Sequence, residues 1–230
     1  MHIIIIIIML KKVTIYGERC SGTHYLTELL TTNFNVHISW EHLKHGRHFM
    51  GFDDLSNTDD TLFIGIIRSP YDWFNSLYRR HHHIPRCNLV NVDSFLYNEF
   101  FSMTEHSNGD VNTEIMFDRN MHTKERYKNI FEMRDTKNKF LVDDMPLLVK
   151  NYLLITHDSL LDNFENTMNS IKNMGLDIKS NIEFPLNIAY YKNYKTQVFV
   201  RNSKPMPISK ELIVGNLNMT YEKRLFADYI

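Results

Sequence analysis

The stretch YGERCSGTHYLTELL, Tyr16 to Leu30, has the pattern of a phosphate-binding loop between a strand and a helix. A β-branched run precedes the loop, two glycines stand five residues apart in it, and leucines follow it at helical spacing. Such glycines permit a tight turn, whose backbone N–H groups form an anion site together with the start of the helix. The usual lysine and magnesium-binding hydroxyl are replaced by Thr23 and His24. The loop therefore predicts an anion site that lacks both side chains needed for magnesium-dependent phosphoryl transfer.

The composition fits one globular domain without a strong overall charge. The chain has 230 residues, 43% of them hydrophobic, which suffices for a single core with one insertion. A net charge of −1 gives no field that would attract nucleic acid or an anionic membrane. The two cysteines, Cys20 and Cys87, lack the spacing of a disulfide framework or a metal site, which indicates a reducing compartment. The apolar start, MHIIIIIIMLKK, is too short for a membrane span and has no basic residue before it, so we expect a cytoplasmic protein.

Strand and helix patterns alternate along most of the chain. Hydrophobic runs predict strands over 11–16, 35–40, 61–67 and 152–156. Helices are expected after the loop, from Ser69 and Pro70 onward, and over 160–171. Residues 88–149 are polar and show no sustained period, which predicts an insertion or an acceptor-side lid. The order indicates one α/β domain over 1–230, a three-layer sandwich with a mostly parallel central sheet.

A second motif, IIRSPYDWFNSLYRRHHH, runs from Ile66 to His83 and follows the third predicted strand. Arg68 comes at the carboxyl end of that strand, the edge where open α/β sheets bind ligands. Ser76 lies two turns into the next helix. An arginine can hold a phosphate by a bidentate contact, and a serine hydroxyl can complete the site.

Together the two motifs resemble those of the sulfotransferase family that uses 3′-phosphoadenosine 5′-phosphosulfate (PAPS). The loop is similar to the family's 5′-phosphosulfate loop, and Arg68 with Ser76 is similar to its 3′-phosphate motif, including the separation of eight residues. The segments HDSLLDNFENTMNSI (157–171) and YEKRLFADY (221–229) resemble two further family segments. The resemblance implies a P-loop-like sulfotransferase architecture, PAPS as the donor, 3′-phosphoadenosine 5′-phosphate (PAP) as the product, and no metal.

The resemblance also implies which residues bind the donor. In the loop these are Arg19, Cys20, Ser21, Gly22, Thr23 and His24. Tyr25 takes the place of an aromatic residue that stacks on adenine, and Arg201, with Lys204 near it, is the candidate for a basic closing loop. Cys20 stands where the family has a lysine that contacts the bridging oxygen of the donor. Either Arg19 takes over that role, or the chain binds the donor with weak catalysis.

A general base is expected at the same edge of the sheet, after the second predicted strand. The segment SWEHLKHG, Ser39 to Gly46, offers His42 and His45 to accept the acceptor proton, and Lys44 to stabilise developing charge. Two alignments with the family fit, with a slight preference for His45, and Glu41 is a carboxylate alternative. The run of histidines at 81–83 is interpreted as surface charge at a helix end rather than as a metal site.

These observations predict a sulfotransferase acting on a hydroxyl, and with lower preference an amine, of a carbohydrate or small metabolite. One alternative is a P-loop nucleotide or small-molecule kinase with a degenerate loop. Another is a non-catalytic nucleotide-binding module of the same fold, suggested by Cys20. The sequence indicates no nucleic-acid partner and no membrane span, and it leaves the acceptor and the oligomeric state open.

Overall fold

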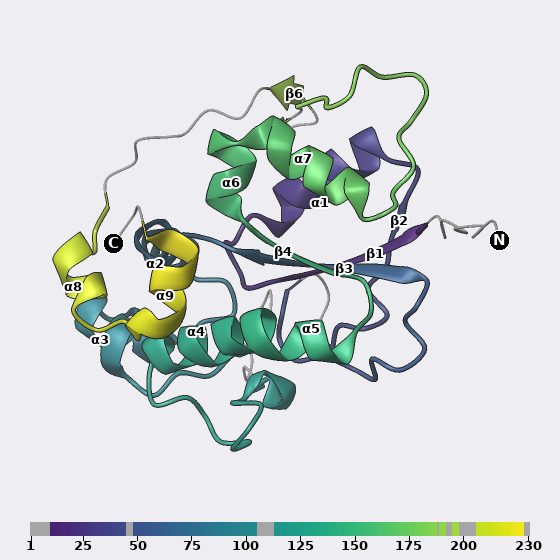
Figure 1. Cartoon of the computed structure of the whole chain (residues 1–230). Helices are drawn as coiled ribbons and strands as arrows, with labels where there is room; N and C mark the ends of the chain where they lie inside the picture. Colours follow the sequence, from purple (N-terminus) through teal and green to yellow (C-terminus); the bar gives the residue numbers. More distant parts are fainter. Residues whose placement is uncertain are drawn as a thin grey trace.

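A four-stranded parallel sheet forms the centre of the protein, with strand order β2-β1-β3-β4 (Figure 1). This computed structural model describes residues 10–44, 48–104, 113–187, 189–191, 195–197 and 206–227. The strands are β1 Lys12–Gly17, β2 His37–Ile38, β3 Thr61–Ile67 and β4 Tyr152–Thr156. The prediction of an α/β fold around a mostly parallel sheet is confirmed.

The two central strands form the most deeply buried part of the sheet. β3 is buried at every residue, as expected for the unbroken apolar run TLFIGII. β1 pairs with β3 along its whole length, from Lys12 opposite Thr61 to Gly17 opposite Ile66. Because side chains alternate along a strand, Val13 faces one hydrophobic cluster and Tyr16 faces another. The loop that follows Gly17 therefore starts from a rigid strand.

β2 is shorter than the predicted range 35–40. Only His37 and Ile38 pair with β1. Before them, the N–H of Asn35 donates to the carbonyl of Asp177 at 2.8 Å, and Phe34 forms an antiparallel bridge with Ile178. The chain ahead of β2 thus bonds to another segment instead of the sheet.

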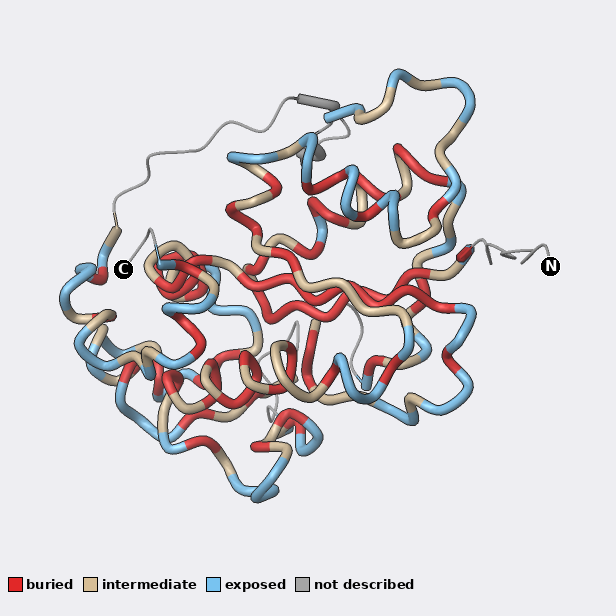
Figure 2. The backbone as a smooth tube through the Cα atoms, in the orientation of Figure 1, coloured by how far each residue is buried: buried red, intermediate tan, exposed pale blue. Residues whose placement is uncertain are grey.

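Helices cover both faces of this sheet, and the buried strands lie between them (Figure 2). One face carries α1 Thr23–Asn33, α6 His157–Asp162 and α7 Phe164–Asn173. The other carries α4 Ile130–Lys139, the π-helical turn η3 Phe140–Asp144 and α5 Met145–Leu148. Leucines of α1 pack with β1 in one cluster, whereas Phe140 of η3 packs with Tyr16 and Phe63 in the other.

A further group of helices gathers at one end of the sheet (Figure 1). It consists of α2 Pro70–Arg80, α3 Val92–Tyr97, α8 Lys210–Val214 and α9 Met219–Phe226. Trp73 and Phe74 of α2 are the centre of the hydrophobic cluster there. The remaining elements are the 3₁₀ turns η1 Arg86–Leu89 and η2 Met116–Asp118, and an antiparallel pair, β5 Ala189–Tyr191 and β6 Lys195–Gln197. No helix in the described part of the chain is long and apolar enough to cross a bilayer.

The expected insertion at 88–149 contains a core element that the sequence pattern did not reveal. Its last part, α4, η3 and α5, is the helical layer on one face of the sheet. A π-helical turn adds one residue per turn, so the apolar face shifts along this helix and no sustained 3.6 period appears in the sequence. In addition, α4 buries Arg134, which pairs with Glu222 of α9 at 2.5 and 2.9 Å. Only residues before α4 remain candidates for an acceptor-side lid.

Candidate functional site

The loop after β1 turns sharply and ends at an uncapped helix. Cys20 and Gly22 have left-handed backbone angles, with φ of 64° and 95°. Gly22 is the N-cap residue of α1 and no side chain caps that helix end. The carbonyls of Arg19 and Cys20 accept hydrogen bonds from Trp73 Nε1 at 2.7 Å and from an Arg68 guanidinium nitrogen at 3.2 Å. Because both carbonyls already accept hydrogen bonds, the N–H groups of the loop and the positive end of the α1 dipole can bind an anion.

The two sequence motifs meet at Cys20. Arg68 donates to its carbonyl at 3.2 Å, and Ser76 on α2 lies close enough to its thiol to influence the thiol pKa. Burial raises the pKa of the Cys20 thiol, although the hydrogen bond from Ser76 and the charges of Arg80 and Arg68 partly offset this effect. Side chains 48 and 56 residues away along the chain thus converge on one loop residue.

Arg68 keeps unused hydrogen-bonding capacity at the end of β3. Its side chain is 20% exposed, and its nearest carboxylate, Asp72, lies 4.0 Å away. Its Nε is buried and has no hydrogen-bond partner among the residues that the structure describes. Burial lowers the pKa of this guanidinium. A bound anion would satisfy the open donors of Arg68.

Two residues at the start of α6, His157 and Asp158, hold the site together and were missed in the sequence. Ser69 and Pro70 begin α2 as expected, but Ser69 donates its N–H and its hydroxyl to Asp158, at 3.0 and 3.3 Å. The His157 ring packs against Gly22, where an added Cβ would lie 2.3 Å from His157 Cδ2. The sequence feature that could have pointed to them was their position directly after β4, at the edge where such sheets bind ligands.

Beneath the loop lies a buried group of four charged residues, here called the loop ion cluster: Glu18, Arg19, Asp118 and Lys137. Arg19 is fully buried, and its Nε binds Glu18 at 2.6 Å while its other nitrogens reach Asp118 at 3.6 Å and the His82 carbonyl at 3.2 Å. Burial alone would raise the pKa of Glu18, but Arg19 and Lys137 hold it down to about 2. The structure thus gives no support to the hypothesis that Arg19 replaces the missing lysine.

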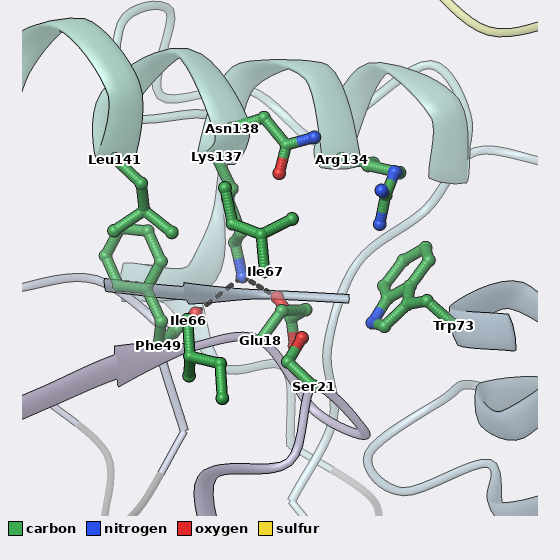
Figure 3. A pocket seen from close by; sticks show the side chains of 10 residues that line it. All are labelled: Glu18, Ser21, Phe49, Ile66, Ile67, Trp73, Arg134, Lys137, Asn138 and Leu141. Carbon is green, nitrogen blue, oxygen red and sulfur yellow. Dashed lines mark hydrogen bonds and ion pairs between the residues drawn. The ribbon is translucent and has the colours of Figure 1, made fainter. Parts of the chain in front are cut away.

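Lys137 uses all three of its N–H donors inside the protein. They bind Glu18, Asp118 at 2.6 Å and the carbonyl of Phe49 at 2.7 Å. Figure 3 shows the ammonium group between the Glu18 carboxylate and Phe49. The cavity beside it, which Ser21 also lines, measures about 10 Å³, which is room for about one water molecule. This cavity is therefore too small to hold a substrate.

A histidine that the sequence analysis did not select, His48, lies beside the loop. The N–H of the next residue, Phe49, donates to the Gly17 carbonyl at 3.0 Å. The His48 ring lies 6.5 Å from that of His24 and 6.2 Å from that of His83. Burial lowers the pKa of His48 to about 4. The sequence feature that could have pointed to His48 was its place in the same histidine-rich segment as His42 and His45.

The residues that the sequence analysis predicted for the base and its surroundings do not include His48, and they lie at other positions or outside the described residues. The Nδ1 of His42 is 3.1 Å from the Asp54 carbonyl, and its ring lies 5.5 Å from Phe63, which pairs with the middle of β1. Lys44 forms an exposed ion pair with Asp53 at 2.7 Å, and Glu41 is exposed. His45 and Arg201 both fall outside the described residues.

The remaining predicted loop residues divide between the core and the surface. Tyr25 is 9% exposed, packs in the core, and donates its hydroxyl to Asn187 at 2.9 Å, which favours a core role for its ring over adenine stacking. Ser21 and Thr23 are buried and His24 is exposed. Over the described ranges, no group of three or more histidine, cysteine or acidic residues is arranged to hold a metal ion.

Comparisons with known proteins give a structural likeness but no sequence match. No protein-family model and no curated protein sequence matches this chain. The crystal structure of mouse sulfotransferase SULT7A1 complexed with PAP is similar at a TM-score of 0.39 and 15% sequence identity. The likeness covers 74% of this chain and 60% of that chain, so this chain spans less than two thirds of the mouse protein's length.

Replacing Gly22 with alanine should distort the loop. The added Cβ would meet His157 at 2.3 Å, and φ of 95° is strained for any residue with a side chain. We expect a loss of about 2 kcal/mol or more in the free energy of unfolding, measured by urea denaturation. Gly215→Ala is the control, because Gly215 has an ordinary φ of −63°. Equal losses in the two variants would contradict this account of the loop.

The stability of the protein should fall on acidification through His48. The pKa of His48 is about 4 in the folded protein and about 6.5 when unfolded, so the unfolded chain binds the proton first as the pH drops. The contribution of His48 to the free energy of unfolding is complete above about pH 6.5 and is lost by about pH 4. It amounts to at most about 3 kcal/mol. Urea denaturation at several pH values should show that the free energy of unfolding depends less steeply on pH in His48→Gln than in the wild type. The exposed His37→Gln should keep the wild-type slope, and an unchanged slope in His48→Gln would refute the assignment.

Proposed function

We propose that this protein is a PAPS-dependent sulfotransferase that acts on a hydroxyl of a carbohydrate or small metabolite. The observation that carries the proposal is the convergence of Arg68 and Ser76 on Cys20 of the anion loop. This contact supports a single continuous site made of the two motifs that resemble the family's 5′ and 3′ binding motifs. The proposal includes an amine as the alternative acceptor and a cytoplasmic location.

In this proposal the donor is held at its two charged ends. The N–H groups at the start of α1, with Ser21, Thr23 and His24 near them, receive the 5′-phosphosulfate. Arg68, with its open Nε, and Ser76 receive the 3′-phosphate. Arg201 remains a candidate for closing over the donor.

The chemistry requires one base and no metal. The acceptor oxygen forms a bond to sulfur while the bond from sulfur to the bridging oxygen of the donor breaks, and the electron pair leaves with PAP. The acceptor proton passes to a base. We assign His48 to this role because its segment bonds to the start of the loop at Gly17. Its pKa of about 4 keeps it neutral at pH 7 and makes it a weaker base than an exposed imidazole. His45 stays an alternative base.

A calorimetric titration with PAP and with ATP plus magnesium tests the proposal against a kinase. The loop lacks the kinase-type lysine and hydroxyl at Thr23 and His24, so PAP should bind more tightly. Equal or tighter binding of ATP would overturn it. The non-catalytic alternative is favoured by Cys20 alone, and PAP binding without turnover on any acceptor would support it.

Arg68→Ala should weaken the binding of PAP selectively. Loss of a charge-assisted contact to the 3′-phosphate costs about 1.5–3 kcal/mol, whereas adenosine 5′-phosphosulfate lacks that phosphate and should bind almost as before. Ser76→Ala should show the same selectivity more weakly. Arg86→Ala, an exposed arginine in η1, is the control. Equal losses for both ligands would mean that Arg68 only supports the loop.

His48→Ala should lower turnover by about 10²–10⁴ with little change in donor affinity, as expected for a general base. His42→Ala is the matched control, because its ring lies beside the middle of the sheet. Steady-state kinetics with PAPS and an active acceptor would measure both variants. Near-normal turnover in His48→Ala would direct attention to His45.

A further inference from the structure

The central sheet ends on one side in a strand that lacks the usual protection of a sheet edge. In the order β2-β1-β3-β4, β4 is an outermost strand, with α6 and α7 on one side of it and α5 on the other (Figure 1). Proteins usually shorten, charge or cover such an edge, because an open one pairs with other strands. β2, at the opposite edge, has two residues. β4 has five, YLLIT, with neither a charge nor a proline.

The hydrogen-bond register shows which backbone groups of β4 point away from the sheet. The N–H of Phe63 donates to the carbonyl of Asn151 at 2.9 Å, and Phe63 lies opposite Tyr152. In a parallel pair, the backbone groups of successive residues face opposite sides. Those of Leu153 therefore face β3, and those of Tyr152 and Leu154 face outward. Within the described ranges, no protein group bonds to these outward N–H and C=O groups.

A groove of about 310 Å³ runs along this edge. One of its walls is β4, and short polar side chains from the α6 and α7 region form the other: Ser159, Asn163, Asn166, Thr167 and Ser170. The described residues that line the groove include no charged one. An added strand would lie about 4.8 Å from β4, and these short side chains leave room for it.

The two ends of the groove differ in charge. At the amino end of β4, Lys150 is exposed and binds Asp59 at 3.3 Å. Because α7 runs back along β4, its last turn brings Lys172 toward the same end, which is therefore positive by one charge (Figure 1). The carboxyl end of β4 leads into α6, and the exposed acids Asp162 and Glu165 lie where α6 passes into α7. The edge is thus basic at one end and acidic at the other.

We propose that β4 pairs antiparallel with β4 of a second copy of this chain, so that the two sheets become one. With Leu154 opposite Leu154 of the second copy, the outward groups of Tyr152 meet those of Thr156 of the second copy. The same twofold arrangement brings the basic end of each edge beside the acidic end of the other. An unrelated peptide could match the backbone groups but not this charge pattern. Because the two β2 edges left outside are short, the assembly closes at two copies.

Analytical ultracentrifugation of the full chain, from about 1 to 200 µM, tests whether it forms a dimer. A strand-to-strand contact is small, so we expect a monomer–dimer equilibrium within that range. Hydrogen exchange over 152–156 should slow as the dimer forms, because the outward amides gain acceptors. A monomer throughout the range would overturn the proposal, and so would a dimer whose formation leaves exchange in β4 unchanged.

Charge exchange tests the antiparallel arrangement. Lys150→Glu and Glu165→Lys should each raise the dimer dissociation constant about threefold or more, because each places like charges across the twofold axis. The double variant restores opposite charges and should return to within about twofold of wild type. Lys210→Glu, an exposed lysine in α8, is the control. A double variant that stays weakened, or an equal loss in Lys210→Glu, would refute the arrangement.

Filling the groove provides a test that does not depend on charge. Ser170 is exposed, so Ser170→Trp should fold normally and obstruct the second strand, whereas Ser170→Ala should not. We expect the dissociation constant of the dimer to rise at least tenfold in Ser170→Trp and to change less than twofold in Ser170→Ala. A dimer of unchanged affinity in Ser170→Trp would show that the copies meet at another surface, which would overturn the proposal.

Discussion

The ammonium group of Lys137 connects three separate parts of the chain, and the geometry of the site depends on it. It binds Glu18 in the loop, Asp118 in η2 and the Phe49 carbonyl next to His48. Buried charges of this kind are tolerated only when each is paired, and removing one partner typically costs about 3–5 kcal/mol. The loop ion cluster contains two positive and two negative residues, so it is balanced as it stands. The loop and the His48 segment are therefore held in one fixed relation.

This balance determines which charges face a ligand. Arg19 and Lys137 neutralise acids inside the protein, so neither adds to the field at the loop surface. Among the described residues, the cation that contacts the loop and is also partly exposed is Arg68, just before α2. The buried ions hold the loop in shape, and in the proposed function Arg68 recognises the anion. An arginine in the loop is therefore a poor guide to ligand binding unless its burial is known.

Sequence reasoning recovered the parts of the fold that have strong local patterns. β3 and β4 have the predicted bounds, because an unbroken apolar run between turns has few alternatives. It also predicted that the loop and the Arg68 motif lie at the same edge of the sheet, since both follow parallel strands. It missed α4 and η3, where a π-helical turn and buried polar residues hide the helical period. The burial of Arg19 and the position of His48 depend on tertiary contacts that no local pattern encodes.

Contacts from the α2 region hold the loop in place without using the side chain at position 20. Three contacts fix this region: Trp73 binds the Arg19 carbonyl, Arg68 binds the Cys20 carbonyl, and Ser69 at the start of α2 binds Asp158 of α6. The first two bind the loop backbone itself, so they do not depend on the side chain at position 20. The shape of the loop therefore does not require a lysine at position 20, because its backbone is held by Trp73 and Arg68.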